Sequence, residues 1–331
     1  MPAKRLSVIG IVLPALLISC NGCGNSFGLK RTPPPADAPA AEVAIAGAKV
    51  MIGVGDIATC GNSGDEATAL LVDSVLRANA AAAVETVVFT LGDHAYPDAS
   101  DRNLARCFTP SWGDPAKLIM KSIRPSIGNH DYMVQRGAPY YRYFGSRAGD
   151  AGKGYYSYDV GEWHVIVLNS ELAIEGTVGD RRTQDEWLRD DLQKNRKLCT
   201  MAYFHHPLFS SSWRRGEPPM ERIWAILYAS DVDLVLSGHD HHYERFGPQT
   251  PAGAPDTVKG IEQILVGTGG ATLRGFGPRF GIRGGSPAAN SLIQIQGYFG
   301  VLILTLGTNE YRSAFLDTEG RVWDRHGRKC R

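Results

Sequence analysis

The sequence has almost no excess charge of either sign. It contains 35 lysines and arginines against 34 aspartates and glutamates, which leaves a formal net charge of +1 over 331 residues. No strong overall field therefore attracts nucleic acid or an anionic membrane surface. Any preference for an anionic ligand must come from a local site. A fixed-period repeat is also lacking, so one folded domain over residues 49–331 is the simplest interpretation.

The apolar run near the N-terminus, residues 6–17, is too short to span a bilayer stably. It follows Lys4 and Arg5, and a positive segment before a short apolar one is typical of a signal peptide. The run leads into Leu-Ile-Ser-Cys, which resembles a bacterial lipobox ending at Cys20. We therefore expect a signal peptide over residues 1–20, lipid attachment at Cys20 and a place in the bacterial cell envelope, periplasmic or at the cell surface. An ordinary secretory signal and an uncleaved anchor are the alternatives.

Residues 21–48 are rich in proline and alanine. Such a segment buries too little apolar area to fold, so we expect a semi-extended linker that holds a domain away from a membrane.

Cysteine is scarce, with six in the chain. Export would favour disulfides among those that follow Cys20. With Cys23 set aside in the linker, the remaining four allow three pairings. We favour Cys60–Cys107 with Cys199–Cys330, because Cys60 and Cys107 both follow early strand ends.

From residue 49 onward, short apolar runs alternate with helical patterns, which predicts an α/β domain. The expected strands cover residues 49–55, 86–92, 122–128, 198–204, 232–238 and 263–270. A hairpin is expected over 154–170 and a β-rich stretch over 298–324. The expected helices cover 65–84, 183–195 and 220–229, with irregular helical structure over 101–121.

Residues that can bind metal ions follow the ends of five of these strands. They are Asp56, Asp93 and Tyr96, Asn129 and His130, His205 and His206, and His239 and His241. Ligands in open α/β sheets bind beyond the carboxyl ends of the strands, so we expect the five loops to converge on one crevice. Each motif alone is weak, because a Gly-Asp pair after a strand is commonly a turn. Together they predict a metal site.

The side-chain types indicate which metals such a site would take. Carboxylate, amide oxygen, imidazole and phenolate suit iron, manganese or zinc, and no cysteine lies among them. Seven donors are more than one ion can hold, and they fit two ions that share a carboxylate. The donors are Asp56, Asp93, Tyr96, Asn129, His205, His239 and His241.

Two other site types lack their motifs. The glycine-rich GTGG at 267–270 has neither a GxGxxG pattern nor a P-loop lysine, so we expect no nucleotide cradle there. No HxHxDH block is present, which argues against a metallo-β-lactamase type of hydrolase.

Five blocks, GDIA, GDHAY, GNHD, HHP and GHDH, occur in this order and resemble the signature blocks of calcineurin-like metallophosphoesterases. Tyr96, three positions after Asp93, resembles the tyrosine of the purple acid phosphatase branch. Ala58 stands where many phosphodiesterases and nucleases of the superfamily carry a histidine. The third block departs from the GNHE of plant-like members. The resemblance covers nearly all of residues 49–331 and implies two β-sheets packed together and flanked by helices.

The resemblance also implies how the donors divide. The first ion would take Asp56, Tyr96 and His241, the second would take Asn129, His205 and His239, and Asp93 would be shared. The ions implied are Fe(III) with Fe(II), Zn(II) or Mn(II). His130 matches the family histidine that contacts the phosphate or the leaving group, with an orienting role as the alternative.

The function implied is hydrolysis of phosphate monoesters of small molecules by a metal-bound hydroxide, as in acid phosphatases. A phosphodiesterase or nucleotidase of the same superfamily is the alternative, and a non-catalytic metal-binding or adhesive lipoprotein is a further one. No role as a nucleic-acid scaffold is expected. The sequence predicts no oligomeric state.

Substrate contacts are predicted for His206, Arg214 and His242. Arg214 and Arg215 could form a phosphate clamp, or be a solvated pair. For His94 a contact with the metal region stays open, whereas His164 is expected to be a packed core histidine.

Overall fold

The computed structural model describes residue 45, residues 47–276 and residues 287–331. The expected signal peptide, the lipobox with Cys20 and nearly all of the expected linker lie outside the described residues. They therefore stay predictions. Within the described ranges, no helix is both long and apolar enough to cross a membrane.

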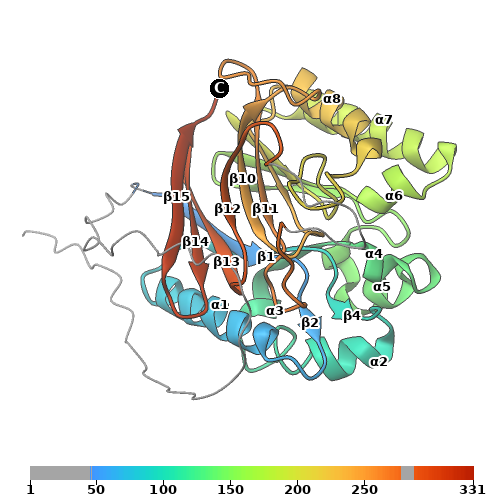
Figure 1. Ribbon diagram of the computed structural model, residues 1–331, viewed down its shortest axis with the longest axis vertical. Helices are drawn as coiled ribbons and strands as arrows, with labels where there is room; N and C mark the ends of the chain where they lie inside the picture. Colours follow the sequence, from blue (N-terminus) through green and yellow to red (C-terminus); the bar gives the residue numbers. More distant parts are fainter. Residues whose placement is uncertain (1–44, 46, 277–286) are drawn as a thin grey trace, which may run out of the picture. The chain divides into compact units, whose positions relative to one another are not determined.

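The first of two large sheets has six strands in the order β15-β14-β13-β1-β3-β5 (Figure 1). The strands are β1 (Lys49–Val54), β3 (Thr86–Leu91), β5 (Ile123–Ser126), β13 (Gly300–Leu306), β14 (Glu310–Asp317) and β15 (Val322–Lys329). β1, β3 and β5 run parallel to one another, and β13 joins β1 in antiparallel register. The carboxyl ends of three adjacent strands thus meet at one edge.

The second sheet has seven strands in the order β12-β10-β11-β9-β8-β7-β6. The strands are β6 (Tyr156–Val160), β7 (Trp163–Val167), β8 (Cys199–Tyr203), β9 (Leu234–Ser237), β10 (Tyr243–Gln249), β11 (Ile261–Val266) and β12 (Ser291–Ile295). β7, β8, β9 and β11 are parallel, and their residues are fully buried apolar runs with few exceptions, as expected for strands covered on both faces. A short parallel pair, β2 (Ala58–Thr59) with β4 (Ala95–Tyr96), joins two loops at the strand ends.

Helices cover the outer faces of the two sheets. In Figure 1, α1 lies beside the first sheet, and α6, α7 and α8 lie beside the second. Their bounds are α1 (Gly64–Ala81), α6 (Ser170–Ile174), α7 (Val178–Lys194) and α8 (Glu221–Ala229). The shorter helices are α2 (Asp101–Asn103), α3 (Ile119–Ser122), α4 (Asn129–Tyr132) and α5 (Ala138–Phe144), with single turns η1 (Leu104–Phe108), η2 (Gln135–Gly137), η3 (Gly145–Ala148) and η4 (Pro218–Met220).

Aromatic side chains join the inner faces of the two sheets. The rings of Tyr243 on β10 and Phe315 on β14 stack at 4.3 Å, and those of Trp163 on β7 and Tyr311 on β14 meet edge to face at 5.9 Å. All four are fully buried. Burial of this apolar surface stabilises the layered core. The predicted α/β sandwich of two packed sheets flanked by helices is confirmed.

Two disulfides match the pairing favoured from the sequence. Cys60 is bonded to Cys107, which ties the loop after β2 to η1. Cys199 at the start of β8 is bonded to Cys330 beyond β15, so this bridge joins the two sheets.

The sequence analysis placed the start of α7 too late. The helix begins at Val178 rather than at residue 183. Thr177 Oγ1 accepts from the backbone N–H of Asp180 (3.1 Å), and Asp180 Oδ2 accepts from that of Thr177 (3.0 Å). This capping box satisfies two free donors at the helix start and so sets its first residue.

Strands β10 and β12 were also missed. β10 carries Glu244 and Arg245, whose charges are unusual inside a strand, yet both are buried. The Arg245 guanidinium donates to Asp324 of β15 at 2.7 and 3.1 Å. Tertiary partners thus stabilise these charges in a strand that the local pattern does not indicate.

Candidate metal centre

The predicted ligands lie in the segments that follow the carboxyl ends of five strands. Asp56 follows β1, Asp93 follows β3 and Asn129 follows β5, which are neighbours in the first sheet. His205 follows β8 and His239 follows β9, which are neighbours in the second sheet. Because the two sheets pack face to face, these loops meet where the strands of both sheets end.

The backbone of this region is held in an uncommon conformation. Asp56, Asp93 and His239 have φ values of 61°, 56° and 72°, in the left-handed region that costs a side-chain-bearing residue about 1 kcal/mol or more. Close packing accompanies this strain, since a Cβ on Gly128 would lie 2.4 Å from Asp93 Oδ1. The glycine therefore leaves room for a carboxylate in a fixed position.

The first set of donors surrounds the phenol oxygen of Tyr96. Tyr96 Oη lies 2.8 Å from Asp56 Oδ1, 2.9 Å from Asp93 Oδ2 and 3.2 Å from His241 Nε2. His241 Nε2 is also 3.2 Å from Asp56 Oδ1. Four donor atoms from three loops thus face one another.

The second set surrounds the amide oxygen of Asn129. Asn129 Oδ1 lies 3.1 Å from His205 Nε2 and 3.1 Å from His239 Nδ1. His205 Nε2 is 3.2 Å from Asp93 Oδ2, the same oxygen that Tyr96 approaches. Asp93 therefore stands between the two sets.

Backbone carbonyls orient two of the imidazoles. His205 Nδ1 lies 2.6 Å from the carbonyl oxygen of Leu91, and His241 Nδ1 lies 2.7 Å from that of Thr272. A carbonyl only accepts, so Nδ1 carries the proton in each ring, and the lone pair of the neutral ring is at Nε2. In both residues Nε2 faces the other donors, which is how a histidine presents itself to a metal ion.

The electrostatics of the cluster favour a cation. Burial alone would raise the pKa of Asp56, but the neighbouring His241 lowers it below the ordinary value. Burial would also raise the pKa of Asp93, but the stronger effect of the neighbouring His205 lowers it below the ordinary value. Burial would likewise lower the pKa of His205, but Asp93 raises it to about 10. The two carboxylates are therefore ionised and hold positive charge close to them.

Tyr96 behaves differently. Burial, together with the negative charges of Asp56 and Asp93, raises the pKa of its phenol well above the ordinary value. The phenol is protonated in this setting, and it would ionise only beside a strong positive charge.

Groups of buried side chains in this cluster could hold metal ions. Buried histidine and aspartate side chains form two groups, and within each group the possible ligand atoms lie within 4.8 Å of one another. One group consists of Asp56, Asp93 and His205, and the other of His205, His206 and His239. Carboxylate, amide, phenol and imidazole donors are those that iron, zinc and manganese accept. The structure thus brings together all seven side chains that the sequence analysis proposed as ligands.

His130 lies at the rim of this cluster. Its side chain is 26% exposed, and Nε2 lies 3.9 Å from Asp93 Oδ2. Nδ1 lies 2.5 Å from the carbonyl oxygen of Pro97, and the ring packs on Tyr96 with centroids 4.4 Å apart. Nε2 is therefore the nitrogen free to meet a ligand.

Arg214 reaches the same cluster from the loop after β8. Its Nη1 lies 2.9 Å from His239 Nε2 and 3.7 Å from Glu217 Oε1. Glu217 Oε1 is in turn 3.8 Å from His239 Nε2. Arg215 is exposed.

His206 and His242 are buried beside the cluster. His206 Nδ1 lies 2.9 Å from Glu171 Oε1, and the ring packs on that of His239 at 4.2 Å. His242 Nε2 lies 3.3 Å from Glu244 Oε2. Both arrangements suit support of neighbouring groups, and substrate contact by either histidine stays a prediction.

The other two histidines weighed from the sequence have side-chain partners other than the seven proposed ligands. His164 is buried between Asp159 and Asp191, at 2.9 and 2.8 Å, as a core histidine. His94 is also buried, with Nδ1 2.9 Å from Asp131 Oδ2.

Sequence reasoning missed the supporting carboxylates Asp131, Glu171 and Glu217. The signal for Asp131 was its place in the GNHD block, directly after His130. Glu171 and Glu217 stand in no motif.

Comparison with known proteins points to the same family as the five sequence blocks. The family model of the calcineurin-like phosphoesterases matches residues 50–243, more than half of the chain. Purple acid phosphatase 23 of Arabidopsis thaliana is 27% identical over 166 residues, which cover 46% of this chain and 35% of that protein. Purple acid phosphatase 18 of the same plant is 31% identical over 193 residues, covering 51% and 42%. The chain thus spans less than half the length of these relatives.

The fold is similar to that of purple acid phosphatase PPD1 from yellow lupin seeds. That structure aligns with a TM-score of 0.66 at 20% identity and covers 85% of this chain and 54% of that one. The chain therefore belongs to the calcineurin-like phosphoesterase family and, within it, to the branch that resembles the purple acid phosphatases.

Proposed function

We propose that this protein hydrolyses phosphate monoesters at a centre of two metal ions. The observation that carries the proposal is the position of Asp93. One of its oxygens, Oδ2, lies 2.9 Å from Tyr96 Oη of the first donor set and 3.2 Å from His205 Nε2 of the second. A carboxylate oxygen in this place suits a bridge between two cations.

The residues that would hold the ions follow from the two sets. Asp56, Tyr96 and His241 would hold the first ion, Asn129, His205 and His239 the second, and Asp93 both. When bound, the ions would supply the positive charge that activates water and stabilises phosphoryl oxygens. The chain's own residues position the donors and the substrate.

Tyr96 argues for iron in the first set. Its phenol stays protonated beside two carboxylates, so binding it as a phenolate calls for added positive charge, and a trivalent cation supplies more of it than a divalent one. Fe(III) meets this need, and Fe(II), Zn(II) or Mn(II) suits the asparagine and two histidines of the second set.

His130 is placed to move a proton. The Pro97 carbonyl holds the Nδ1 side of its ring, and the partly exposed Nε2 lies beside the cluster. We propose that His130 acts as a general acid in its imidazolium form: Nδ1–H stays on the Pro97 carbonyl, Nε2–H passes its proton to the leaving oxygen of the ester, and the ring becomes neutral.

Arg214 is placed to bind the phosphate. A cation on Nδ1 of His239 would leave Nε2 as an N–H donor, which cannot accept from Arg214. Glu217 is then the acceptor within reach, and the guanidinium is available for a phosphate oxygen, with which it forms charge-assisted hydrogen bonds.

Steady-state kinetics would test this function. We expect kcat/KM for p-nitrophenyl phosphate to exceed that for bis(p-nitrophenyl) phosphate. In Asn129→Ala, kcat/KM for p-nitrophenyl phosphate should fall at least ~100-fold, and the metal content should fall with it. The matched control is Asn195→Ala. Asn195 directly follows α7, and its side-chain amide donates to Thr200 Oγ1. A preference for the diester would instead support a phosphodiesterase, and full activity in Asn129→Ala would refute catalysis at this centre.

We also propose that the protein is exported and lipid-anchored at Cys20 in the bacterial cell envelope. The support is the signal-peptide pattern and the Pro/Ala-rich segment of residues 21–48 before the folded unit. Detergent partitioning of the full chain and of Cys20→Ala would test it, and an unchanged partition would argue against the anchor.

A further inference from the structure

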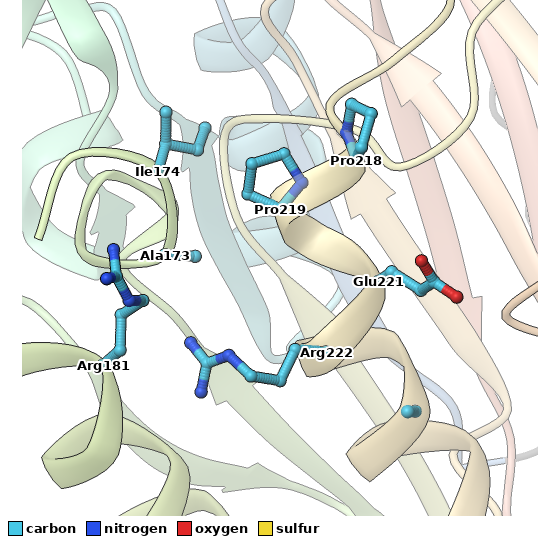
Figure 2. Close-up of a pocket in the computed structure, with 8 residues that line it drawn as sticks. Ala173, Ile174, Arg181, Pro218, Pro219, Glu221 and Arg222 are labelled. Atoms are coloured by element: carbon cyan, nitrogen blue, oxygen red, sulfur yellow. The ribbon is translucent and has the colours of Figure 1, made fainter. Parts of the chain in front are cut away.

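A hollow between α6, α7 and α8 lies outside the metal centre and is lined in part by Arg181 and Arg222 (Figure 2). Both arginines already have partners within the protein. Arg181 Nη1 donates to the carbonyl oxygen of Gly176 at 2.6 Å, and Arg222 Nη1 forms an ion pair with Asp185. The described residues therefore give no reason to place a ligand there.

The disulfide between Cys60 and Cys107, in contrast, joins two segments beside the first donor set. Cys60 directly follows β2, and Cys107 lies in η1. Asp56 precedes β2, and Tyr96 ends β4, where it lies opposite Thr59 of β2. The role of both residues as ligands of the first ion rests on the proposed function. β2 thus follows one ligand and pairs with the strand that carries the other, and the disulfide begins where β2 ends.

The pairing of β2 with β4 is short. Each strand has two residues. Backbone hydrogen bonds extend the ladder toward the metal centre, because the N–H of Ile57 donates to the carbonyl oxygen of Asp93 (2.9 Å) and that of Ala58 to His94 (3.1 Å). So few bonds offset little of the entropy lost in ordering both segments, and a ladder of this length opens readily unless another contact holds it.

The disulfide fastens this ladder to a packed helical turn. η1 packs against both β2 and β4. Cys107 is 5% exposed, and the ring of the buried Phe108 meets that of His94 edge to face at 5.4 Å. Cys60, in contrast, is exposed. The bond therefore ties the exposed end of the ladder to a buried element.

We propose that the Cys60–Cys107 bond positions Tyr96 for the first metal ion by holding β2 on β4. Without the bond, the short ladder and the packing of its side chains would be left to hold β2. Movement of β2 would carry Asp56 away from Tyr96, whose Oη lies 2.8 Å from Asp56 Oδ1. The first ion would then bind more weakly, because its donors would no longer face one another.

Hydrogen exchange on the metal-free chain would test whether the bond holds the ladder. The variant is Cys60→Ser with Cys107→Ala, which replaces the exposed cysteine by a polar residue and the buried one by an apolar residue. The amides of Ile57 and Ala58 should exchange at least ~10-fold faster than in the wild type, because the ladder opens more often. The amides of β3 should stay protected, which would show that the variant is folded.

The matched control is Cys199→Ala with Cys330→Ser, which removes the other disulfide in the same way. Cys199 is the first residue of β8, whereas His205 follows the last. The control bond therefore lies at the end of the strand that is remote from the metal centre. The two ladder amides should exchange in this variant as they do in the wild type.

Reduction of the folded wild-type chain provides the same comparison if the double variant does not fold. The two thiols of dithiothreitol close into a cyclic disulfide, and their protons pass to the sulfurs of Cys60 and Cys107. Cys60 is exposed whereas Cys199 is fully buried, so this bond should be reduced first, which alkylation and mass spectrometry would verify. Exchange at Ile57 and Ala58 should then accelerate as in the variant.

Affinity for Fe(III), measured by competition with a chelator, tests the link to the metal centre. It should fall ~10-fold or more in Cys60→Ser with Cys107→Ala and stay at the wild-type value in the control. A wild-type chain that binds no iron would refute the iron assignment, whereas the exchange rates of the metal-free chain would still decide whether the bond holds the ladder. Unchanged exchange at the two ladder amides, equal acceleration in the control, or faster exchange with unchanged Fe(III) affinity would overturn the proposal.

Discussion

His94 Nδ1 lies 2.9 Å from Asp131 Oδ2, and both side chains are buried between the loops that follow β3 and β5. Asp131 also accepts from three backbone N–H groups, those of Asp93 (2.9 Å), His94 (3.1 Å) and Gly128 (2.9 Å). On its other side, His94 Nε2 lies 2.7 Å from Thr90 Oγ1. One carboxylate thus fixes the loop that carries Asp93 against the loop that carries Asn129.

Asp131→Asn should therefore loosen the metal centre without altering a ligand. An amide has one acceptor oxygen in place of two and presents an NH2 group to donors, so buried N–H groups lose their partner. Each such loss costs ~1–3 kcal/mol. We expect the free energy of unfolding in urea to fall by about 2–4 kcal/mol, with a lower metal content.

Asp190→Asn is the control for this change, because Asp190 is exposed and bonded to Lys194 on the surface of α7. Its effect should stay within about 0.5 kcal/mol. If Asp131→Asn unfolds like the wild type and keeps its metal, the carboxylate does not fix the loops.

His130→Ala tests proton donation through its dependence on the leaving group. An alkoxide needs a proton as it leaves, so kcat for an alkyl phosphate should fall ~10²–10⁴-fold. p-Nitrophenolate leaves without a proton, so kcat for p-nitrophenyl phosphate should fall much less. Equal losses for the two substrates would assign His130 to orienting the substrate.

Tyr96→Phe tests the assignment of iron to the first donor set. The change removes the phenol oxygen that lies between Asp56 and Asp93 and keeps the ring that packs on His130. A visible absorption band from tyrosinate bound to Fe(III) should disappear. Tyr298→Phe, a tyrosine that packs on Trp323, should keep the band. A band that persists unchanged in Tyr96→Phe would exclude this phenol as a ligand.

The sequence carried most of the information on the proposed ligands because each follows a strand end. Asp56 and Asp93 come directly after apolar runs, and neighbouring parallel strands bring such positions together. The same pattern does not say how a side chain is supported. Glu171 supports His206 through a contact between residues 35 positions apart, which only the packing of α6 on the strand ends creates.

The sequence pattern failed to indicate strand β10 for the same reason. Glu244 and Arg245 are charged, and local preference disfavours a buried strand at that place. Glu244 accepts from Ser211 and Ser291, which lie far away in the sequence. Tertiary hydrogen bonds of this kind override local propensity, and they leave no periodic signal.

The buried carboxyl group of Asp65 should make the free energy of unfolding depend on pH. Its carboxyl group is buried at the start of α1 and accepts from Ser111 Oγ at 2.5 Å. Burial raises its pKa from 3.8 to about 7, although the hydrogen bond from Ser111 opposes the shift. Between about pH 4 and pH 7 the folded chain therefore holds a proton that the unfolded chain has lost, so this group makes stability fall as pH rises through that range.

Asp65→Asn removes this dependence, because the amide is neutral at every pH and its oxygen still accepts from Ser111. We expect the variant to unfold like the wild type near pH 4 and to be about 1–2 kcal/mol more stable at pH 8, as measured by urea unfolding. Glu186→Gln, on the exposed face of α7, should leave the pH profile of the wild type unchanged. A variant whose advantage is the same at pH 4 and pH 8 would show that Asp65 is ionised throughout, since only a group that is protonated in the folded state makes that advantage grow with pH.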